Sequence, residues 1–243
     1  MSDAGAGAAI AATAEDRPVR DAATVILWRP GAEGPEVLMG TRGAGAAFMP
    51  NKVVFPGGAV DATDADIPLA GLPPEACLAR LAAAPRAEGR ATPQGLLAAA
   101  IRELWEEAGL LLGRQAHWPG DRAVPPDWAG FAATGHMPDA AAFRFVFRAV
   151  TPPGRPRRFD ARFFLVPAEA VAGDADDFGR ACEELSFLHW APLARVRGYD
   201  LPFITEVVLA EIGPLIEAGG EAPEGGVPYV TNDDPVSSVV RLR

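Results

Sequence analysis

Three glutamates and an arginine lie within one short stretch, Ala98 to Leu112, which reads AAAIRELWEEAGLLL. In a helix, residues three and four positions apart are neighbours on one face, and this spacing relates Glu103 to Glu106 and Glu107, and Arg102 to Glu106. Carboxylates near a helix C-terminus oppose its macrodipole, at roughly 0.3–1 kcal/mol each. A divalent cation would remove that penalty, because Mg²⁺ and Mn²⁺ prefer hard oxygen ligands. The cluster is therefore a candidate metal site, although isolated glutamates are often only a solvated acidic face.

The same stretch must be helical to bring these side chains together. Apolar residues recur at the spacing of a buried helical stripe, namely Leu97, Ile101, Leu104, Ala108 and Leu111. Gly109 is a suitable residue for ending a helix. Thr92 followed by Pro93 fits an N-cap with proline at the first helical position. We therefore predict one helix here, with its acidic residues opposite its buried face.

A glycine bend precedes this helix in the sequence. The apolar pair Val53 and Val54 leads into FPGGAVD, residues Phe55 to Asp61. A strand that runs into Pro-Gly-Gly makes a tight turn without a side chain at the bend. At such a turn a backbone carbonyl can approach a metal ion or a phosphate closely.

Together the bend and the helix resemble the box of the Nudix (MutT-like) hydrolases, G-x5-E-x7-R-E-U-x-E-E-x-G-U, where U is aliphatic. Gly58 matches the first glycine. The second half matches without exception at Arg102, Glu103, Leu104, Glu106, Glu107, Gly109 and Leu110. The arginine follows the glycine by 14 positions in the box and by 102 − 58 = 44 positions here, which leaves an insertion of 30 residues. Counting back eight positions from Arg102 places Gln94 where the box has its internal glutamate, a mainly structural residue.

This resemblance implies an α/β fold, an α/β/α sandwich around a mixed sheet with a mainly helical insertion. It also implies hydrolysis of a diphosphate linked to a nucleoside, with Mg²⁺ or Mn²⁺. Glu103 and Glu107 would be the first metal ligands, Glu106 would share the site, and the carbonyl of Gly58 is a further candidate. Arg102 would orient a glutamate. The chemistry agrees, because metal ions activate water and neutralise developing charge while carboxylates take up a proton.

The residues before the bend bear on the substrate. Coenzyme A diphosphatases in this family carry an upstream pattern like LLTxR[SA]x3Rx3GxVxFPGG. Several residues fall in register with it: Leu38, Arg42, Val53, Phe55, Pro56, Gly57 and Gly58. Ala47 and Asn51 depart from it, yet FMPNKVVFPGGAVD and the long insertion resemble the peroxisomal branch of these enzymes and its bacterial relatives. Arg42 is either a phosphate contact, which suits arginine geometry, or a solvated strand end; Lys52 is a weaker candidate of the same kind.

The densest basic group of the chain is a second candidate for phosphate binding. It consists of Arg157, Arg158 and Arg162, within a segment RRFDARFF that also resembles the coenzyme A diphosphatase branch. These arginines either bind an added phosphate, such as the 3′-phosphate of coenzyme A, or form a solvated edge.

An acidic loop leads into the last predicted strand, Leu185 to Trp190. Glu184 resembles the glutamate that often opens the last Nudix strand. It, or its neighbour Glu183, is a candidate outer metal ligand or base.

Pattern alone assigns four further elements, three strands and a helix: Ala22–Trp28, Glu36–Arg42, Arg157–Val166 and Leu201–Ile212. The first two strands should form a hairpin. Residues Phe143–Val150 fit either a helix or a strand. The insertion, about residues 62–93, contains helical spacing over Glu75–Ala84. Because both of its ends join site elements, we expect it to form a small helical cap near the site entrance.

Composition limits the other possibilities. The net charge of −10 argues against a nucleic-acid-binding surface, and without an 18-residue apolar run no membrane span is expected. Residues 1–16 are rich in Ala and Gly, without the features of a signal peptide, and predict a disordered tail before a single domain over residues 17–243. Two separated cysteines, Cys77 and Cys182, fit a reducing cytoplasm. The oligomeric state is open, a homodimer included.

Three functional hypotheses follow. The first is a diphosphatase that cleaves coenzyme A or acyl-coenzyme A into 3′,5′-ADP and (acyl-)4′-phosphopantetheine. The second is the same chemistry on ADP-ribose, NADH or a dinucleoside polyphosphate. The third is a Nudix-fold binding or regulatory module without catalysis, against which the intact Glu103, Glu106 and Glu107 count.

Overall fold

The computed structural model describes residues 18–43, 45, 49–86, 89, 91–120, 123–232 and 236–243. The expected tail at residues 1–16 lies outside them. The helices and strands follow in chain order: β1 Val19–Gly31, β2 Gly34–Arg42, β3 Val53–Val54, β4 Gly57–Ala59, the 3-10 helix η2 Ala62–Asp66, α1 Glu75–Ala82, α2 Pro93–Ala108, β5 Gly113–Gln115, η3 Pro126–Trp128, α3 Ala129–Ala132, β6 His136–Pro138, β7 Arg144–Val150, β8 Arg158–Pro167, η4 Ala168–Ala170, β9 Leu185–Pro192, η5 Val196–Gly198, α4 Phe203–Glu217, β10 Val227–Thr231 and β11 Ser238–Leu242.

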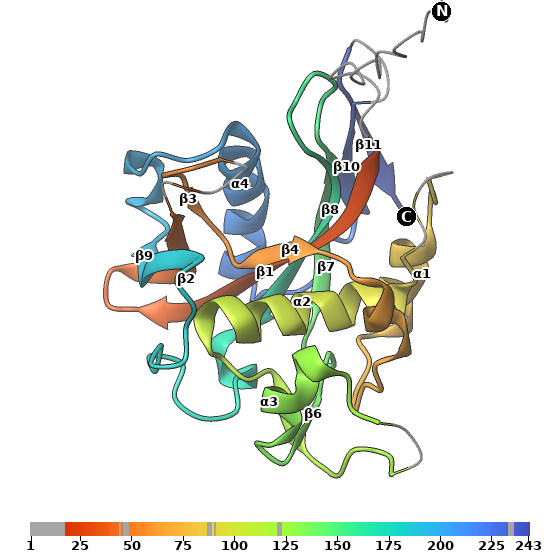
Figure 1. Ribbon diagram of the computed structural model, residues 1–243. Coiled ribbons are helices and arrows are strands. Elements are labelled where there is room, and N and C mark those ends of the chain that lie inside the picture. The colour runs from red at the N-terminus through yellow and green to blue at the C-terminus, as the bar shows by residue number, and fades with distance from the viewer. Residues whose placement is uncertain are drawn as a thin grey trace, which may run out of the picture.

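A mixed sheet forms the centre of the fold (Figure 1). Its strand order is β11-β10-β7-β8-β1-β2-β3, with β4 added beside β1 and β9 added beside β2. β1 runs parallel to β8 and β10 runs parallel to β7, whereas the other pairs are antiparallel. The expected hairpin is confirmed, since β1 and β2 pair antiparallel from Trp28–Val37 to the turn.

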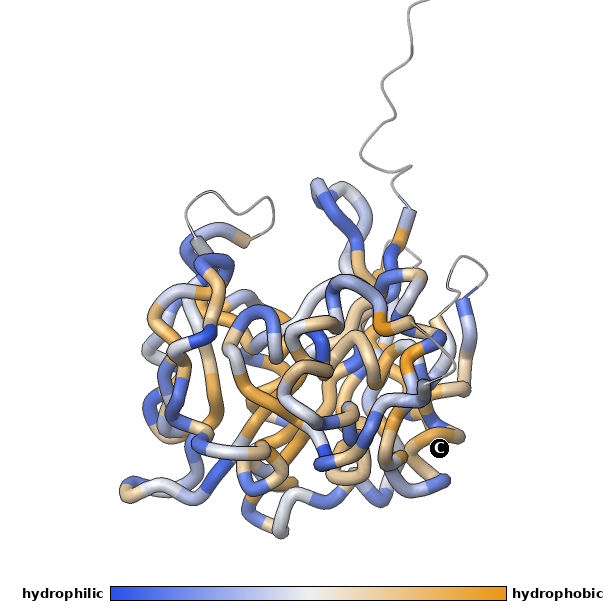
Figure 2. The backbone as a smooth tube through the Cα atoms, turned by 60° about the horizontal axis from the view of Figure 1, so that its bottom comes forward, coloured by the Kyte–Doolittle hydropathy of each residue, from blue (hydrophilic) through white to orange (hydrophobic). Residues whose placement is uncertain are grey.

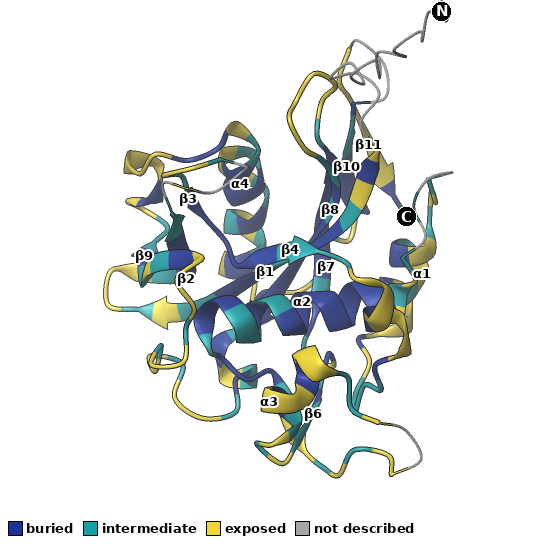
Figure 3. Ribbon diagram, in the orientation of Figure 1, coloured by how far each residue is buried: buried dark blue, intermediate teal, exposed yellow. Residues whose placement is uncertain are grey.

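Helices cover both faces of this sheet and enclose one core on each side. The first core contains Leu97 and Ile101 of α2, and the second contains Val208 and Ile212 of α4. β1 contributes to both cores, because successive side chains of a strand point to opposite faces. Figure 3 shows buried residues along the sheet-facing side of α2, and Figure 2 shows apolar strands inside a largely polar shell. The expected α/β/α sandwich is confirmed.

The helix that carries the glutamates begins and ends where its capping residues predict, and it ends before the apolar stretch to Leu112 does. It spans Pro93–Ala108, because the Thr92 hydroxyl accepts a hydrogen bond from the Gly95 N–H at 3.0 Å and thereby caps its start. It ends at Gly109, whose φ of 72° is left-handed and suits glycine. The three leucines that follow are buried but not helical, so the apolar pattern continues past the end of the helix.

Packing decides the structure of Phe143–Val150 and the place of the inserted segment. Phe143–Val150 contains strand β7, which pairs with β8 on one side and β10 on the other. The described residues of the inserted segment are helical only in η2 and α1, so the expectation of a mainly helical insertion is wrong. Helix α1 packs against β7 and lies at the N-terminal end of α2 (Figure 1). Helix α1 therefore lies away from the C-terminal turns of α2 that carry Glu106 and Glu107, and the expected helical cap over the site is wrong.

Within the described residues, no helix has the length and apolarity needed to cross a bilayer.

Candidate active site

Glu107 is the most deeply buried carboxylate of the predicted cluster. Its side chain is only 2% exposed, and its Oε2 accepts a 2.7 Å hydrogen bond from the Gly57 N–H of the glycine bend. Its Oε1 is buried without a hydrogen-bond partner, and the Arg42 guanidinium lies beside it, with Nη2 at 3.9 Å. Burial raises the pKa of Glu107 to about 8. A buried oxygen without a donor is what a bound cation would satisfy.

Glu103 lies one turn earlier on α2 and faces the same bend. A Cβ at Gly58 would overlap the Glu103 carboxylate, so the glycine leaves the space that this carboxylate occupies beside β4. Burial also raises the pKa of Glu103, to about 7, although the neighbouring Arg102 opposes this change. The bend and α2, 30 residues further apart than in the usual box, are thus brought into direct contact.

Arg102 is buried and holds several acidic groups at once. Its Nη1 donates 3.0 Å hydrogen bonds to Glu103 Oε1 and Glu106 Oε2, and its Nη2 donates to the Ala59 carbonyl. Its Nε and Nη2 make two parallel 3.0 Å bonds to the two oxygens of Asp64, which is fully buried. Such a bidentate pair fixes the guanidinium in place. This geometry agrees with the predicted role of Arg102 in orienting glutamates.

Asp64 was missed by the sequence analysis, which placed Gln94 at the internal glutamate of the box. Counted forward, the box glutamate lies six positions after its first glycine, and six positions after Gly58 is Asp64. The insertion therefore follows this position instead of preceding it. Gln94 donates its side-chain amide to the Ile67 carbonyl at 2.7 Å and takes no part in the Arg102 bonds. The signal was available, because the carboxylate spacing of Asp61 and Asp64 is that of a capping box, and Asp64 Oδ2 accepts a 2.8 Å hydrogen bond from the Asp61 N–H.

Arg42, the last residue of β2, and Glu184, which directly precedes β9, lie at the same corner. Arg42 Nη1 lies 3.5 Å from Glu184 Oε1, and its Nη2 donates a 3.3 Å hydrogen bond to the Gly57 carbonyl. Glu184 directly precedes β9 and is largely exposed, whereas Arg42 is largely buried. Both residues predicted for this corner are thus brought together with Glu107. Nothing in the described contacts brings the side chain of Glu183 to it.

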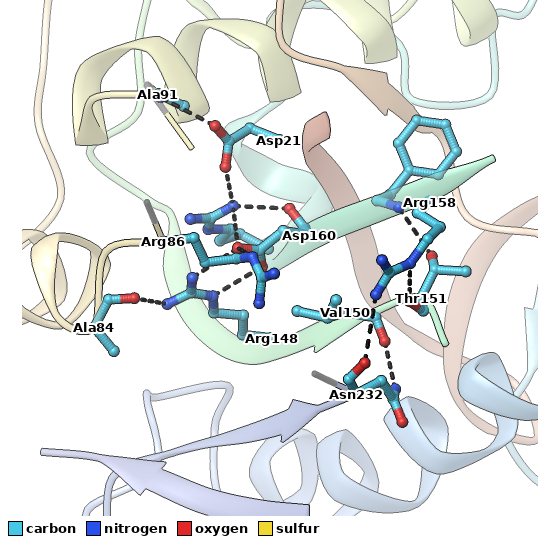
Figure 4. Close-up of polar contacts among 12 residues, drawn as sticks. Asp21, Ala84, Arg86, Ala91, Arg148, Val150, Thr151, Arg158, Asp160 and Asn232 are labelled. Carbon is cyan, nitrogen blue, oxygen red and sulfur yellow. Dashed lines mark hydrogen bonds and ion pairs between the residues drawn. The ribbon is translucent and has the colours of Figure 1, made fainter. Parts of the chain in front are cut away.

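The other predicted phosphate-binding residues have different surroundings. Lys52 pairs with Asp200. Arg162 is buried and pairs with Asp21 and Asp160, which belong to the polar cluster of Figure 4.

Arg158 donates hydrogen bonds to the backbone carbonyls of Thr151 and Asn232 (Figure 4). Residues on β8 that looked like an exposed basic group are therefore engaged with the protein itself. The expectation that Arg162 binds an added phosphate is corrected by its burial among carboxylates, because solvent and ligand do not reach it.

Among the described residues, no three His, Cys, Asp or Glu side chains converge closely enough to hold a metal. Glu106 is turned toward Arg102, while Glu103 and Glu107 face the bend. The donors nevertheless fit Mg²⁺ or Mn²⁺, because they are hard oxygens and one of them, Glu107 Oε1, is buried without a donor.

The raised pKa values of Glu103 and Glu107 predict how pH changes stability without metal. In the unfolded chain both groups ionise near pH 4.5, whereas the folded protein keeps their protons up to about pH 7–8. The folded state then binds more protons than the unfolded state, so the free energy of unfolding falls as pH rises through this window. We expect a loss of at least about 1 kcal/mol, or about 2–4 °C in Tm, between pH 5 and 8.

Differential scanning fluorimetry of metal-free protein at several pH values measures this loss. Added Mg²⁺ should restore Tm most at pH 8, because the ion binds the ionised carboxylates. If the Tm of the parent changed with pH in the same way as that of the Glu107→Gln variant, the buried, titrating carboxylate assigned to Glu107 would be contradicted.

The chain is similar in sequence and in fold to proteins named as Nudix hydrolases. The chain is similar to the crystal structure of a NUDIX hydrolase from Alicyclobacillus acidocaldarius, with 30% sequence identity and a TM-score of 0.57, over 80% of this chain and 91% of that one. The Caenorhabditis elegans protein named "Putative nudix hydrolase 7" is 29% identical over 166 residues. That match covers 63% of this chain and 45% of the relative, so this chain spans less than half of that protein's length. No protein-family model matches the chain.

Proposed function

Because the chain belongs to the Nudix hydrolase family, and is thus a pyrophosphohydrolase, we propose that it hydrolyses a nucleoside diphosphate derivative with Mg²⁺ or Mn²⁺. The observation that carries this proposal is the pair of half-buried Glu103 and buried Glu107 against the Gly57–Gly58 bend, with Glu107 Oε1 left without a donor. A non-catalytic module would have no use for buried carboxylates that repel each other.

Each side chain of the corner has a part in this chemistry. Glu103 and Glu107 would hold the ion, together with the Gly58 carbonyl, and Glu106 would join them on leaving Arg102. When bound, the ion supplies an activated water and offsets the charge that builds up on the leaving phosphate. A carboxylate of this group, or Glu184, takes the proton of the attacking water.

The substrate we propose is coenzyme A or acyl-coenzyme A, which would give 3′,5′-ADP and (acyl-)4′-phosphopantetheine. The register of Leu38, Arg42 and the FPGG bend with the coenzyme A diphosphatase pattern supports it. So does the place of Arg42, whose guanidinium lies between Glu107 and Glu184 and would meet a diphosphate held at the same corner. The burial of Arg162 removes one contact expected for the 3′-phosphate, so Arg42 remains the main cationic candidate.

A substrate panel tests the proposal directly. Coenzyme A, acetyl-coenzyme A, ADP-ribose, NADH and diadenosine tetraphosphate are incubated with the enzyme and Mg²⁺ or Mn²⁺, and the products are identified by liquid chromatography and mass spectrometry. We expect coenzyme A to have the highest kcat/KM and to yield 3′,5′-ADP. Preferred cleavage of ADP-ribose or a dinucleotide would keep the reaction and replace the substrate. Binding without cleavage of any of them would overturn catalysis itself.

A further inference from the structure

Strand β11 forms one edge of the central sheet. The strand order ends at β11, and within the described residues β10 is its only strand partner. Figure 1 shows this edge on the side of the sheet away from β2 and β9, beside which the candidate active site lies. An edge strand presents a row of unpaired N–H and C=O groups, with which another strand can pair. At β11 a second chain can therefore extend the sheet.

The strand lacks most of the features that keep an exposed edge from pairing. Such features are lysine or proline on the strand, or a bulge that twists the edge away. β11 has the sequence SVVRL and pairs with β10 over all five residues without a register shift. Its charged residue, Arg241, is held against its own subunit, because Nη1 donates a 3.1 Å hydrogen bond to the Gly226 carbonyl and Nη2 lies 3.8 Å from Glu211 of α4. The middle of the strand, Val239 and Val240, therefore has no charge that guards it.

Exposed valines occupy this edge on both faces of the sheet. Val236, just before the strand, and Val239 and Val240 within it are three of the seven large apolar side chains that are exposed among the described residues, and Figure 3 colours most of β11 as exposed. In the pairing with β10, Val239 lies opposite Val230 and Val240 lies opposite Tyr229. Directly paired residues share a face, and these two partners pack in the cores on the two sides of the sheet. A strand added here would cover both valines and extend both cores.

The charges around β11 favour a second copy of this chain as the added strand. In the sequence, Asp233 and Asp234 precede the strand, whereas Arg241 and Arg243 lie at its end. Antiparallel pairing about a two-fold axis sets the start of each strand against the end of the other. Acidic residues of one copy then approach basic residues of its partner, which stabilises the pair, whereas parallel pairing would bring like charges together. The strand is thus complementary to itself in the antiparallel orientation.

We propose that β11 is a self-association surface, at which two copies of this protein join their sheets edge to edge through antiparallel β11 strands. Main-chain hydrogen bonds between the copies hold the dimer, and Val239 and Val240 of both copies become buried in it. A five-residue strand gives a small interface, so the dimer is reversible, with a dissociation constant of roughly micromolar order or weaker. The inference is independent of the proposed function, because the glutamates lie near the other edge of the sheet.

Sedimentation velocity of the full chain tests the proposal at concentrations from about 1 μM to about 1 mM. The mass of the parent should rise from that of a monomer to that of a dimer. The Val239→Lys, Val240→Lys double variant places charge on both faces of the edge, as natural edge strands do, and should raise the dissociation constant at least roughly tenfold. Both valines are exposed, so the Tm should stay close to that of the parent.

Phe203→Lys is the matched control. Phe203 is an exposed apolar residue at the start of α4, three positions after Asp200, whose carbonyl accepts a hydrogen bond from Val53 of β3 at the opposite edge of the sheet. The same kind of substitution there should leave the dissociation constant unchanged. A dimer that Phe203→Lys dissociates and the double variant does not would overturn the proposal.

Hydrogen exchange measured by NMR gives a second readout, which needs no variant and so does not depend on the double variant folding. The β11 amides that point away from β10 should exchange slowly in the concentrated parent and faster on dilution. A parent that stays monomeric over the whole concentration range would overturn the proposal. Slow exchange of these amides in such a monomer would show that the chain itself covers the edge.

Discussion

Replacing Glu107 by glutamine is expected to lower kcat by about 10²–10⁴-fold, the range for loss of a group that binds or transfers protons at a reaction centre. Glutamine has nearly the same shape and can still accept the hydrogen bond that the Gly57 N–H donates to Oε2. It loses the negative charge that would hold the ion. Steady-state hydrolysis of the preferred substrate at saturating Mg²⁺ gives the measurement, and KM should change much less than kcat.

The same variant should be at least as stable as the parent when metal is absent. Burial raises the pKa of Glu107, so above about pH 8 the parent holds an ionised carboxylate in a poorly solvated place. A neutral amide avoids that penalty. We therefore expect a higher Tm at pH 8 for the metal-free variant, and a smaller rise in Tm than the parent shows when Mg²⁺ is added.

Glu206→Gln is the matched control, because it makes the same change on the exposed face of α4, on the other side of the sheet. It should leave both activity and the Mg²⁺ response unchanged. A Glu107→Gln variant with the turnover of the parent would remove Glu107 from the site. Loss of turnover together with a lower metal-free Tm would instead indicate a structural role.

The second large effect is expected at Asp64. Its carboxylate is fully buried and makes two 3.0 Å bonds to Arg102. Asp64→Ala leaves the buried guanidinium without its main partner, which costs about 3 kcal/mol at the lower end of the range for a broken buried pair. For a chain of this length that corresponds to a fall in Tm of about 6–12 °C.

Activity should fall as well, because Arg102 also holds Glu103 and Glu106. Residues that orient metal ligands typically change metal affinity or activity about 10–100-fold. Thermal denaturation and kcat measured at a temperature well below the new Tm separate the two effects. A Mg²⁺ titration should show weaker binding at the repositioned glutamates.

Gln94→Ala is the control for this assignment. Gln94 donates one hydrogen bond, to the Ile67 carbonyl, so its loss should cost no more than about 1.5 kcal/mol. Kinetic constants should stay close to those of the parent. If Gln94→Ala proved as damaging as Asp64→Ala, the internal glutamate of the box would after all be represented by Gln94.

Sequence alone could not decide whether Asp64 or Gln94 takes the place of the internal glutamate of the box. Spacing within one helix follows from its 3.6-residue period, so the shared face of Glu103, Glu106 and Glu107 could be predicted without knowing any neighbour. The position of a 30-residue insertion has no such local signal. Counting from either side of it gives a different residue, and only the contact with Arg102 distinguishes them.

Local pattern also predicted the β1–β2 hairpin, the N-cap at Thr92 and the end of the glutamate helix at Gly109. Each depends on residues that are neighbours in the chain, whose preferences are expressed over a few positions. The resemblance to the Nudix box then implied the sandwich around a mixed sheet.

Packing between distant segments determined the rest. Arg42 and Glu184 are 142 positions apart and meet because β2 pairs with β9. Arg162 looked like part of an exposed basic group, but the parallel pairing of β8 with β1 places it beside Asp21, 141 positions away. Phe187 is exposed because a bulge shifts the register of a single strand. The residue types and their spacing along the helix were enough to indicate the chemistry, whereas the partners of each charge depended on strand pairing, which short-range periodicity does not encode.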